Sequence, residues 1–182
     1  PVSIPPFIGR TVTQILNESN FATLTRLLEN FSVTYNFERY EEKSLYNWID
    51  LLNKFDSILE TFVMQDPVSL LIMTSCPIPD DQVFQSPHVP SDELIQLVKQ
   101  VLRVSFVIVS HSSLDTRVVY GSADRLSLLM CSEHYEIANS AMSMIYELLK
   151  NQPKSSLTYL APIPDLPRVL EAFANVGWGH EI

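Results

Sequence analysis

Glycine is scarce in this sequence, which has 4 glycines and 12 prolines among its 182 residues. Tight β-hairpins and phosphate-binding loops both need positive φ angles, which glycine adopts more readily than other residues. The composition therefore argues against an all-β protein and against a glycine-rich nucleotide-binding loop.

Positive charge is also scarce, since 12 Lys and Arg residues stand against 21 Asp and Glu residues and the net charge is −9. The basic residues are scattered along the chain. Nucleic acids and anionic membranes are bound by clustered basic residues, because such clusters create a strong local positive potential. We therefore expect neither nucleic acid nor a membrane as a partner, and we interpret the acidic excess as a solvated surface.

Cysteine and long apolar runs are scarce too, and neither indicates a specific site or a membrane span. Cys76 and Cys131 lie in separate segments and form no C-x-x-C pair, so neither a zinc site nor a disulfide framework is indicated. No apolar run approaches the roughly 18 residues that would cross a bilayer. These features predict a cytoplasmic or nuclear location, and because the sequence opens at Pro1 we expect it to be a piece of a longer protein.

Helical periodicity, by contrast, is abundant in a chain with 46% hydrophobic and 18% charged residues, values typical of one folded domain. Apolar residues cover most of the circumference of a predicted helix from Glu93 to Ser110, which indicates a central helix packed on several sides. A second helical segment is predicted around Thr116 to Met130. An amphipathic third helix follows, with an apolar stripe formed by Ile137, Ala138, Ala141, Met144, Ile145, Leu148 and Leu149. Residues 92–150 therefore form one predicted three-helix unit.

Prolines mark the boundaries of the segments that flank this three-helix unit. Residues 1–9 contain three prolines and are predicted to be an extended arm. Helices are predicted over 10–63, with Asn20 as a possible cap of one of them and Trp48 in the core. Residues 65–90 read as a proline-rich loop, which we interpret as a mobile insertion in preference to a functional loop. Residues 157–182 are expected to start another helical unit.

The sequence Ser110-His111-Ser112-Ser113-Leu114-Asp115 contains the side chains of a hydrolase triad. Catalysis requires these groups to converge in space, which neighbouring residues at a helix end rarely do, and no G-x-S-x-G turn surrounds the serines. We interpret His111 as a residue that favours the negative end of the helix dipole. Ser113 or Asp115 is interpreted as the cap of the next helix.

Other candidate sites have simple structural interpretations. The four histidines lie in separate segments without metal-ligand spacing, and no cofactor is predicted. Asp56 and Glu60 share one helix face and could act as paired carboxylates, but a solvated face is the preferred interpretation. Cys131 is predicted to be a small buried residue at a helix end.

One helix carries a more specific pattern. The stretch SLYNWIDLLNKFDSILE, from Ser44 to Glu60, resembles a helix of the form L-Y-x-W-[IV]-D-L-L-x-[KR]-F-D-x-I-L. That helix belongs to the N-terminal armadillo-like region of the giant HECT-type E3 ubiquitin ligases, the family of the HECT, UBA and WWE domain-containing ligase. The stretches LIQLVKQVLRVSFVIVSHSS, DRLSLLMCSEHYEIANSAMSMIYELLKN and LPRVLEAFANVGWG are similar to later helices of the same region.

The resemblance implies an all-α, armadillo/HEAT-like helical solenoid in which residues 92–150 are one armadillo-like repeat. It further implies a non-catalytic scaffold and substrate-recognition segment, with the catalytic cysteine in a C-terminal domain absent from this chain. The expected partners are protein substrates and neighbouring solenoid repeats, bound through a face formed by Asn139, Ser143 and Glu147. Glu147 stands where peptide-clamping armadillo repeats have asparagine, which argues against clamping of an extended peptide.

Two other functions stay open at this level. An independent helical adaptor unrelated to ubiquitin transfer would show the same helical patterns. A small hydrolase using His111 would show turnover that His111→Ala abolishes.

Overall fold

The computed structural model describes residues 6–34, 48–66 and 89–150, with side chains from residue 11 to residue 31 in the first range. Every regular element within these residues is helical, so the predicted all-α class is confirmed there. The elements are α1 (Pro6–Asn17), α2 (Phe21–Thr34), α3 (Ile49–Val63), α6 (Asp92–Ser110), the 3-10 helix η3 (Leu114–Val119), α7 (Ala123–Leu129) and α8 (Tyr135–Leu149). Within the described ranges, no helix combines the length and apolar character needed to cross a membrane.

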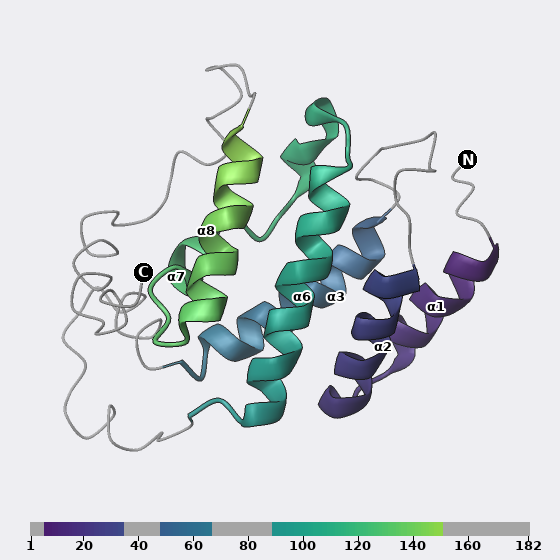
Figure 1. Ribbon diagram of the computed structural model, residues 1–182, viewed down its shortest axis with the longest axis horizontal. Helices are drawn as coiled ribbons and strands as arrows, with labels where there is room; N and C mark the ends of the chain where they lie inside the picture. Colours follow the sequence, from purple (N-terminus) through teal and green to yellow (C-terminus); the bar gives the residue numbers. More distant parts are fainter. Residues whose placement is uncertain (1–5, 35–47, 67–88, 151–182) are drawn as a thin grey trace.

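Helix α6 is the centre of the arrangement. Helices α2 and α8 lie on either side of α6, α3 crosses behind it, and α1 lies beside α2 (Figure 1). Helix α7 packs between α3 and α8. The prediction that α6 is packed on several sides is therefore confirmed, because its neighbours come from before and after it in the sequence.

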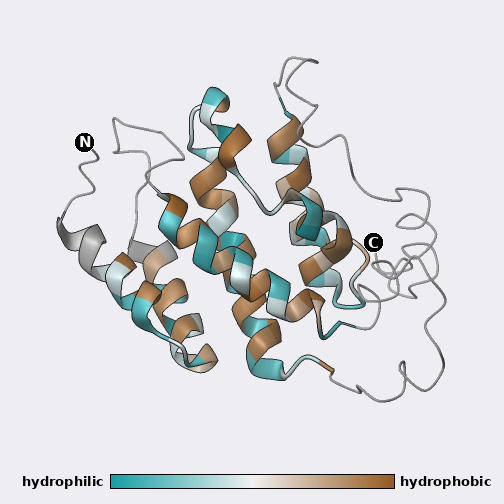
Figure 2. Cartoon of the chain, turned by 180° about the vertical axis from the view of Figure 1, so that it is seen from behind, coloured by the Kyte–Doolittle hydropathy of each residue, from teal (hydrophilic) through white to brown (hydrophobic). Residues whose placement is uncertain are grey.

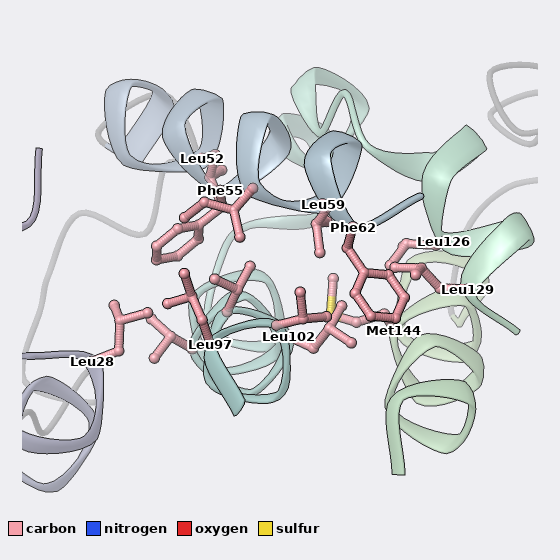
Figure 3. Close-up of a cluster of buried hydrophobic side chains, with 14 of the residues drawn as sticks. Leu28, Leu52, Phe55, Leu59, Phe62, Leu97, Leu102, Leu126, Leu129 and Met144 are labelled. Carbon is pink, nitrogen blue, oxygen red and sulfur yellow. The ribbon is translucent and has the colours of Figure 1, made fainter. Parts of the chain in front are cut away.

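The core lies between α3 and the row formed by α2, α6 and α8. Phe55 of α3 points toward Leu97 of α6, and Phe62, at the other end of α3, lies beside Met144 of α8 (Figure 3). All four side chains are almost completely buried. Burial of each such side chain stabilises the fold by about 1.5–3 kcal/mol, so this interface is a main source of stability. Seen from the side of α3, hydrophilic and hydrophobic residues alternate along the helices, as amphipathic packing requires (Figure 2).

The N-terminal helices begin differently from the prediction in one respect. Helix α1 begins at Pro6, inside the stretch predicted to be extended. Proline is well tolerated at the first position of a helix, where its missing N–H would have no partner within the helix. Asn20 caps α2 as predicted, because its Oδ1 accepts a hydrogen bond from the Thr23 N–H at 3.0 Å.

Helix α3 is tied to both neighbouring segments. Trp48, immediately before the helix, is buried and meets Phe31 edge-on with ring centroids 6.2 Å apart, which confirms it as a core residue. Lys54 donates to the backbone carbonyl of Leu16 at 3.0 Å and to that of Glu18. Its ammonium group therefore caps the C-terminal end of α1, where the helix dipole favours a cation.

The predicted segment from Thr116 to Met130 is not one continuous helix. It divides into η3 and α7, with the extended residue Tyr120 and then Gly121 between them. Glycine has low helix propensity, and Arg117 and Tyr120, just before it, are both buried.

Several predictions lie outside the described residues. These are the loop over most of 65–90, the helical unit at 157–182, the start of the SLYNWID helix before Trp48, and the environment of Cys76.

Candidate partner-binding groove

A groove of about 560 Å³ runs along the surface between α6 and α8. It is lined by Gln96, Lys99, Gln100, Leu102, Arg103, Phe106 and Val107 of α6, and by Tyr135, Glu136, Asn139, Ser140 and Ser143 of α8. We call this surface the α6–α8 groove.

The two helices that form the groove are well defined by their own sequences. Ser91 caps α6 by accepting a hydrogen bond from the Leu94 N–H at 3.2 Å, and Asp92 and Glu93 in the first turn complement the helix dipole. On α8, Ala138 and Ala141 are completely buried. Because alanine is small, a helix that buries it can lie close to its neighbour.

The sides of the groove combine polar and aromatic groups. Lys99 Nζ lies 2.7 Å from Glu136 Oε2 and links the two helices. Arg103 donates from Nε to the Gln100 side-chain oxygen at 3.0 Å, and from Nη2 to the same atom. Phe106 and Tyr135 remain 36% and 49% exposed, although both are large aromatic residues. A surface of this kind can bind a partner by burying the aromatic rings and pairing the polar groups.

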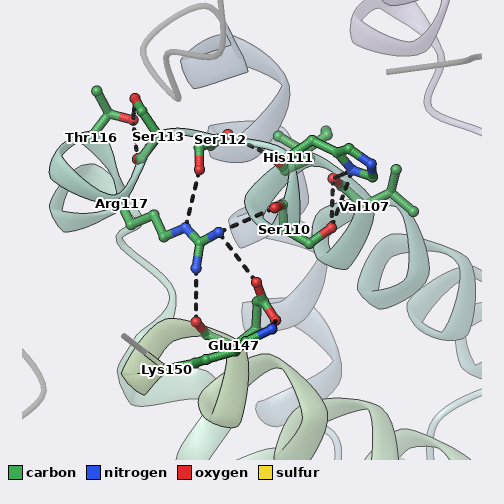
Figure 4. A network of polar contacts seen from close by, with 10 residues as sticks. Val107, Ser110, His111, Ser112, Ser113, Thr116, Arg117, Glu147 and Lys150 are labelled. Atoms are coloured by element: carbon green, nitrogen blue, oxygen red, sulfur yellow. Dashed lines mark hydrogen bonds and ion pairs between the residues drawn. The ribbon is translucent and has the colours of Figure 1, made fainter. Parts of the chain in front are cut away.

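The structure separates the three residues of the predicted partner-binding face. Asn139 and Ser143 are exposed and line the α6–α8 groove. Glu147, one turn further along α8, is only 8% exposed and belongs to the interior. The physical reason is Arg117, whose guanidinium lies against this part of α8 (Figure 4).

Arg117 joins the C-terminal ends of α6 and α8. Its Nη2 lies 3.2 Å from Glu147 Oε1, and its Nη1 donates to the Glu147 carbonyl at 2.9 Å. Nη2 and Nε also donate to the carbonyls of Ser110 and Ser112, at 3.2 Å and 3.4 Å (Figure 4). Because both helix ends carry unpaired carbonyls and negative dipole ends, one buried cation stabilises both, and α6 and α8 are held parallel.

The α6 side of the groove could not be found from the sequence. Nearly every face of α6 carries apolar residues, so the pattern gave no reason to separate exposed Phe106 from its buried neighbours. A possible signal was the polar series Gln96, Gln100 and Arg103, which recurs at three and four residues.

The serine and histidine residues at the end of α6 are used structurally. His111 Nδ1 lies 2.9 Å from the Val107 carbonyl, which can only accept, so Nδ1 carries the proton. That nitrogen therefore cannot take a proton from Ser110 Oγ, 3.3 Å away. Ser113 occupies the N-cap position of η3 and its hydroxyl contacts Thr116 Oγ1 at 3.1 Å.

Asp56 and Glu60 are partly exposed and share one arginine partner. Arg125 of α7 lies between them, with Nη1 3.4 Å from Asp56 Oδ1 and Nη2 3.3 Å from Glu60 Oε2. Asp56 also accepts a hydrogen bond from Ser122 Oγ at 2.6 Å. The two carboxylates therefore attach α3 to α7.

Among the described residues, no group of three or more His, Cys, Asp or Glu side chains could hold a metal ion. Cys131 is fully buried just after α7, as predicted.

A second hollow of about 540 Å³ lies between α3 and the turn that joins α1 to α2, but its lysine, Lys54, is engaged in capping α1. The α6–α8 groove is therefore the better candidate site.

Comparison with known proteins gives one distant relationship. No protein-family profile matches the chain, and no solved structure matches it. Over 146 residues, the chain is 23% identical to the E3 ubiquitin-protein ligase ptr1 of Schizosaccharomyces pombe. The aligned part is 80% of this chain and 4% of ptr1. The chain is therefore distantly similar, over most of its own length, to a small part of an E3 ubiquitin-protein ligase.

Proposed function

We propose that the chain is a non-catalytic scaffold and substrate-recognition segment of an E3 ubiquitin-protein ligase, and that it binds protein partners in the α6–α8 groove. The distant similarity to ptr1 supports the ligase context. The observation that carries the binding role is the groove itself, in which exposed Phe106 and Tyr135 lie beside polar side chains on two rigid helices.

The groove residues favour binding over catalysis. The lining includes neither histidine nor cysteine, and the carboxylate of Glu136 is paired with Lys99. Ser140 and Ser143 also line the groove, but a serine nucleophile needs an adjacent general base, and the described lining supplies no histidine to act as one. The partner is therefore recognised through contact and charge.

The helix arrangement supports an armadillo-like solenoid. Helices α2, α6 and α8 form one layer, and α3 and α7 pack against it (Figure 1). In a solenoid, each repeat buries its apolar surface against the next, and the row of helices continues through the neighbouring repeats. Neighbouring repeats of the same longer chain are accordingly the second class of proposed partner.

The test uses the full-length protein in cells, with two arginines introduced into the groove. Asn139→Arg combined with Ser143→Arg places bulky cations on exposed positions, so the fold is expected to persist while partner binding is lost. Asn30→Arg combined with Gln14→Arg is the control, because these residues are exposed on α2 and α1, outside the groove. Ubiquitin-remnant proteomics then measures which proteins lose ubiquitination.

We expect the groove variant, but not the control, to lower the ubiquitination of a defined subset of proteins while self-ubiquitination of the ligase is unchanged. Equal ubiquitination in the groove variant and the control would refute substrate recognition by this groove. Unchanged ubiquitination of all proteins after deletion of the whole chain would favour an adaptor that is unrelated to ubiquitin transfer.

A further inference from the structure

The charge of the α6–α8 groove differs from that of the whole chain. The chain carries a net charge of −9, whereas the groove lining contributed by the described residues contains two cations, Lys99 and Arg103, and one carboxylate, Glu136. Lys99 is neutralised by Glu136 at 2.7 Å. Arg103 is therefore the source of the local positive charge.

Arg103 is oriented but not neutralised by its neighbours within the described residues. It is exposed, and two of its five N–H groups point at the neutral side-chain oxygen of Gln100. The other N–H groups of the guanidinium have no acceptor in the described part of the chain. A guanidinium held in this way can form a two-pronged hydrogen-bonded pair with a carboxylate, and holding it in advance lowers the entropic cost of binding.

An apolar site lies beside this cation. Phe106 follows Arg103 by three residues, so the two side chains share one face of α6. Tyr135 contributes a second exposed ring from α8. A ligand that pairs with Arg103 can thus bury an apolar side chain against the two rings at the same time.

The length of the groove matches a short peptide segment. Its α6 side extends from Gln96 to Val107, which corresponds to about 17 Å at the helical rise per residue. A partner helix of three turns has the same length. Nucleic acid does not fit this surface, because one uncompensated cation in an acidic chain provides little counterion release.

We propose that the α6–α8 groove binds a short acidic segment of a partner protein, amphipathic and helical. A carboxylate of that segment pairs with Arg103. An apolar side chain three or four residues away from the carboxylate packs on Phe106 and Tyr135. This inference rests on the proposed protein-binding function and names the chemistry of the partner.

The experiment is a selection from a displayed library of random 16-residue peptides on the whole 182-residue chain. Four proteins are compared: wild type, Arg103→Glu, Phe106→Ser and the control Arg26→Glu, which reverses an exposed charge on α2. Circular dichroism and thermal unfolding confirm that each variant is folded. Affinities of the selected peptides are then measured at low and high salt.

We expect wild type and Arg26→Glu to select the same peptides, with Asp or Glu three or four residues from an aromatic or aliphatic residue. Arg103→Glu should weaken the binding of these peptides at least about tenfold, as expected for the loss of one charge-assisted pair worth roughly 1.5–3 kcal/mol. Phe106→Ser should weaken peptide binding without removing the acidic preference. High salt should weaken peptide binding to the wild type but not to Arg103→Glu.

The outcomes separate this inference from the proposed function. If the selected peptides show no acidic preference, and Phe106→Ser weakens their binding but Arg103→Glu does not, the acidic partner is overturned and the protein-binding function still stands. If no groove substitution changes the binding of any selected peptide, both proposals fail.

Discussion

Replacing Arg117 with methionine tests whether one buried cation holds α6 and α8 together. Methionine matches the arginine side chain as far as Nε and carries no charge, so the change removes the guanidinium and keeps the packing of the apolar stem. It deprives the Ser110, Ser112 and Glu147 carbonyls of their donor and leaves the Glu147 carboxylate, whose side chain is 10% exposed, without its main partner.

The expected cost follows from the burial of this pair. Removing one member of a buried ion pair costs about 3–5 kcal/mol, because the remaining charge is left without compensation. Lys150 Nζ lies 3.9 Å from Glu147 Oε2 and supplies part of that compensation, so we expect the lower end of the range. A loss of about 3 kcal/mol would lower Tm by about 6–12 °C in a domain of this size.

Glu147→Gln should cost less, about 1–2 kcal/mol, because the Arg117 guanidinium keeps its carbonyl acceptors and the glutamine oxygen can still accept. The double variant Arg117→Met with Glu147→Met should be more stable than Arg117→Met alone, since neither charge is then buried without its partner. Urea unfolding followed by circular dichroism measures all three free energies of unfolding.

Two results would contradict this account of Arg117. One is a change of less than about 1 kcal/mol for Arg117→Met, a value typical of exposed ion pairs. The other is a double variant that is less stable than Arg117→Met by the full cost of the second substitution, because independent effects would mean that the two side chains are not coupled.

Three further predictions concern the core, pH and the contact between α3 and α7. Phe62→Ala should lower the free energy of unfolding by about 3–5 kcal/mol in urea titrations, because a fully buried ring is replaced by a cavity. Burial, helped by the nearby Asp56 carboxylate, raises the pKa of Tyr120 well above its usual value of 10.0. The unfolded chain should therefore lose the Tyr120 proton at lower pH than the folded chain. The free energy of unfolding should then fall by up to about 1.4 kcal/mol per pH unit above pH 10. Urea unfolding from pH 9 to 11 should show a smaller fall for Tyr120→Phe than for the wild type. Asp56→Asn should destabilise the chain by about 1 kcal/mol and Glu60→Gln by less. The reason is that Asp56 also accepts a hydrogen bond from the Ser122 hydroxyl, while Glu60 is the more exposed. Equal losses of stability in thermal unfolding would refute this ranking.

The position of most described helices could be predicted from the sequence because helical periodicity is a local property. The apolar stripes of α3, α6 and α8, the cap at Asn20 and the burial of Trp48 all follow from residues within a few positions of one another. The start of α1 at Pro6 could not be predicted in the same way, because proline breaks a helix in its interior but is accepted in its first turn.

The candidate site was only half predictable. Asn139 and Ser143 were identified from the polar face of α8, and the structure places both in the groove. The α6 side of the groove was missed, because a helix that is apolar nearly all round gives no local sign of which residue faces solvent. Only the positions of α2, α3 and α8 around α6 determine that Phe106 is partly exposed.

The amino-acid sequence by itself determined the all-helical class, the approximate helix positions and the side of each amphipathic helix that faces the core. Only the tertiary structure decided the surroundings of the polar residues. Glu147 has the same spacing as the exposed residues of α8, yet it is buried by Arg117, which precedes it by 30 residues. A carboxylate on a helix surface looks the same in sequence whether water or a buried cation lies opposite, because its partner is brought there by the packing of distant segments.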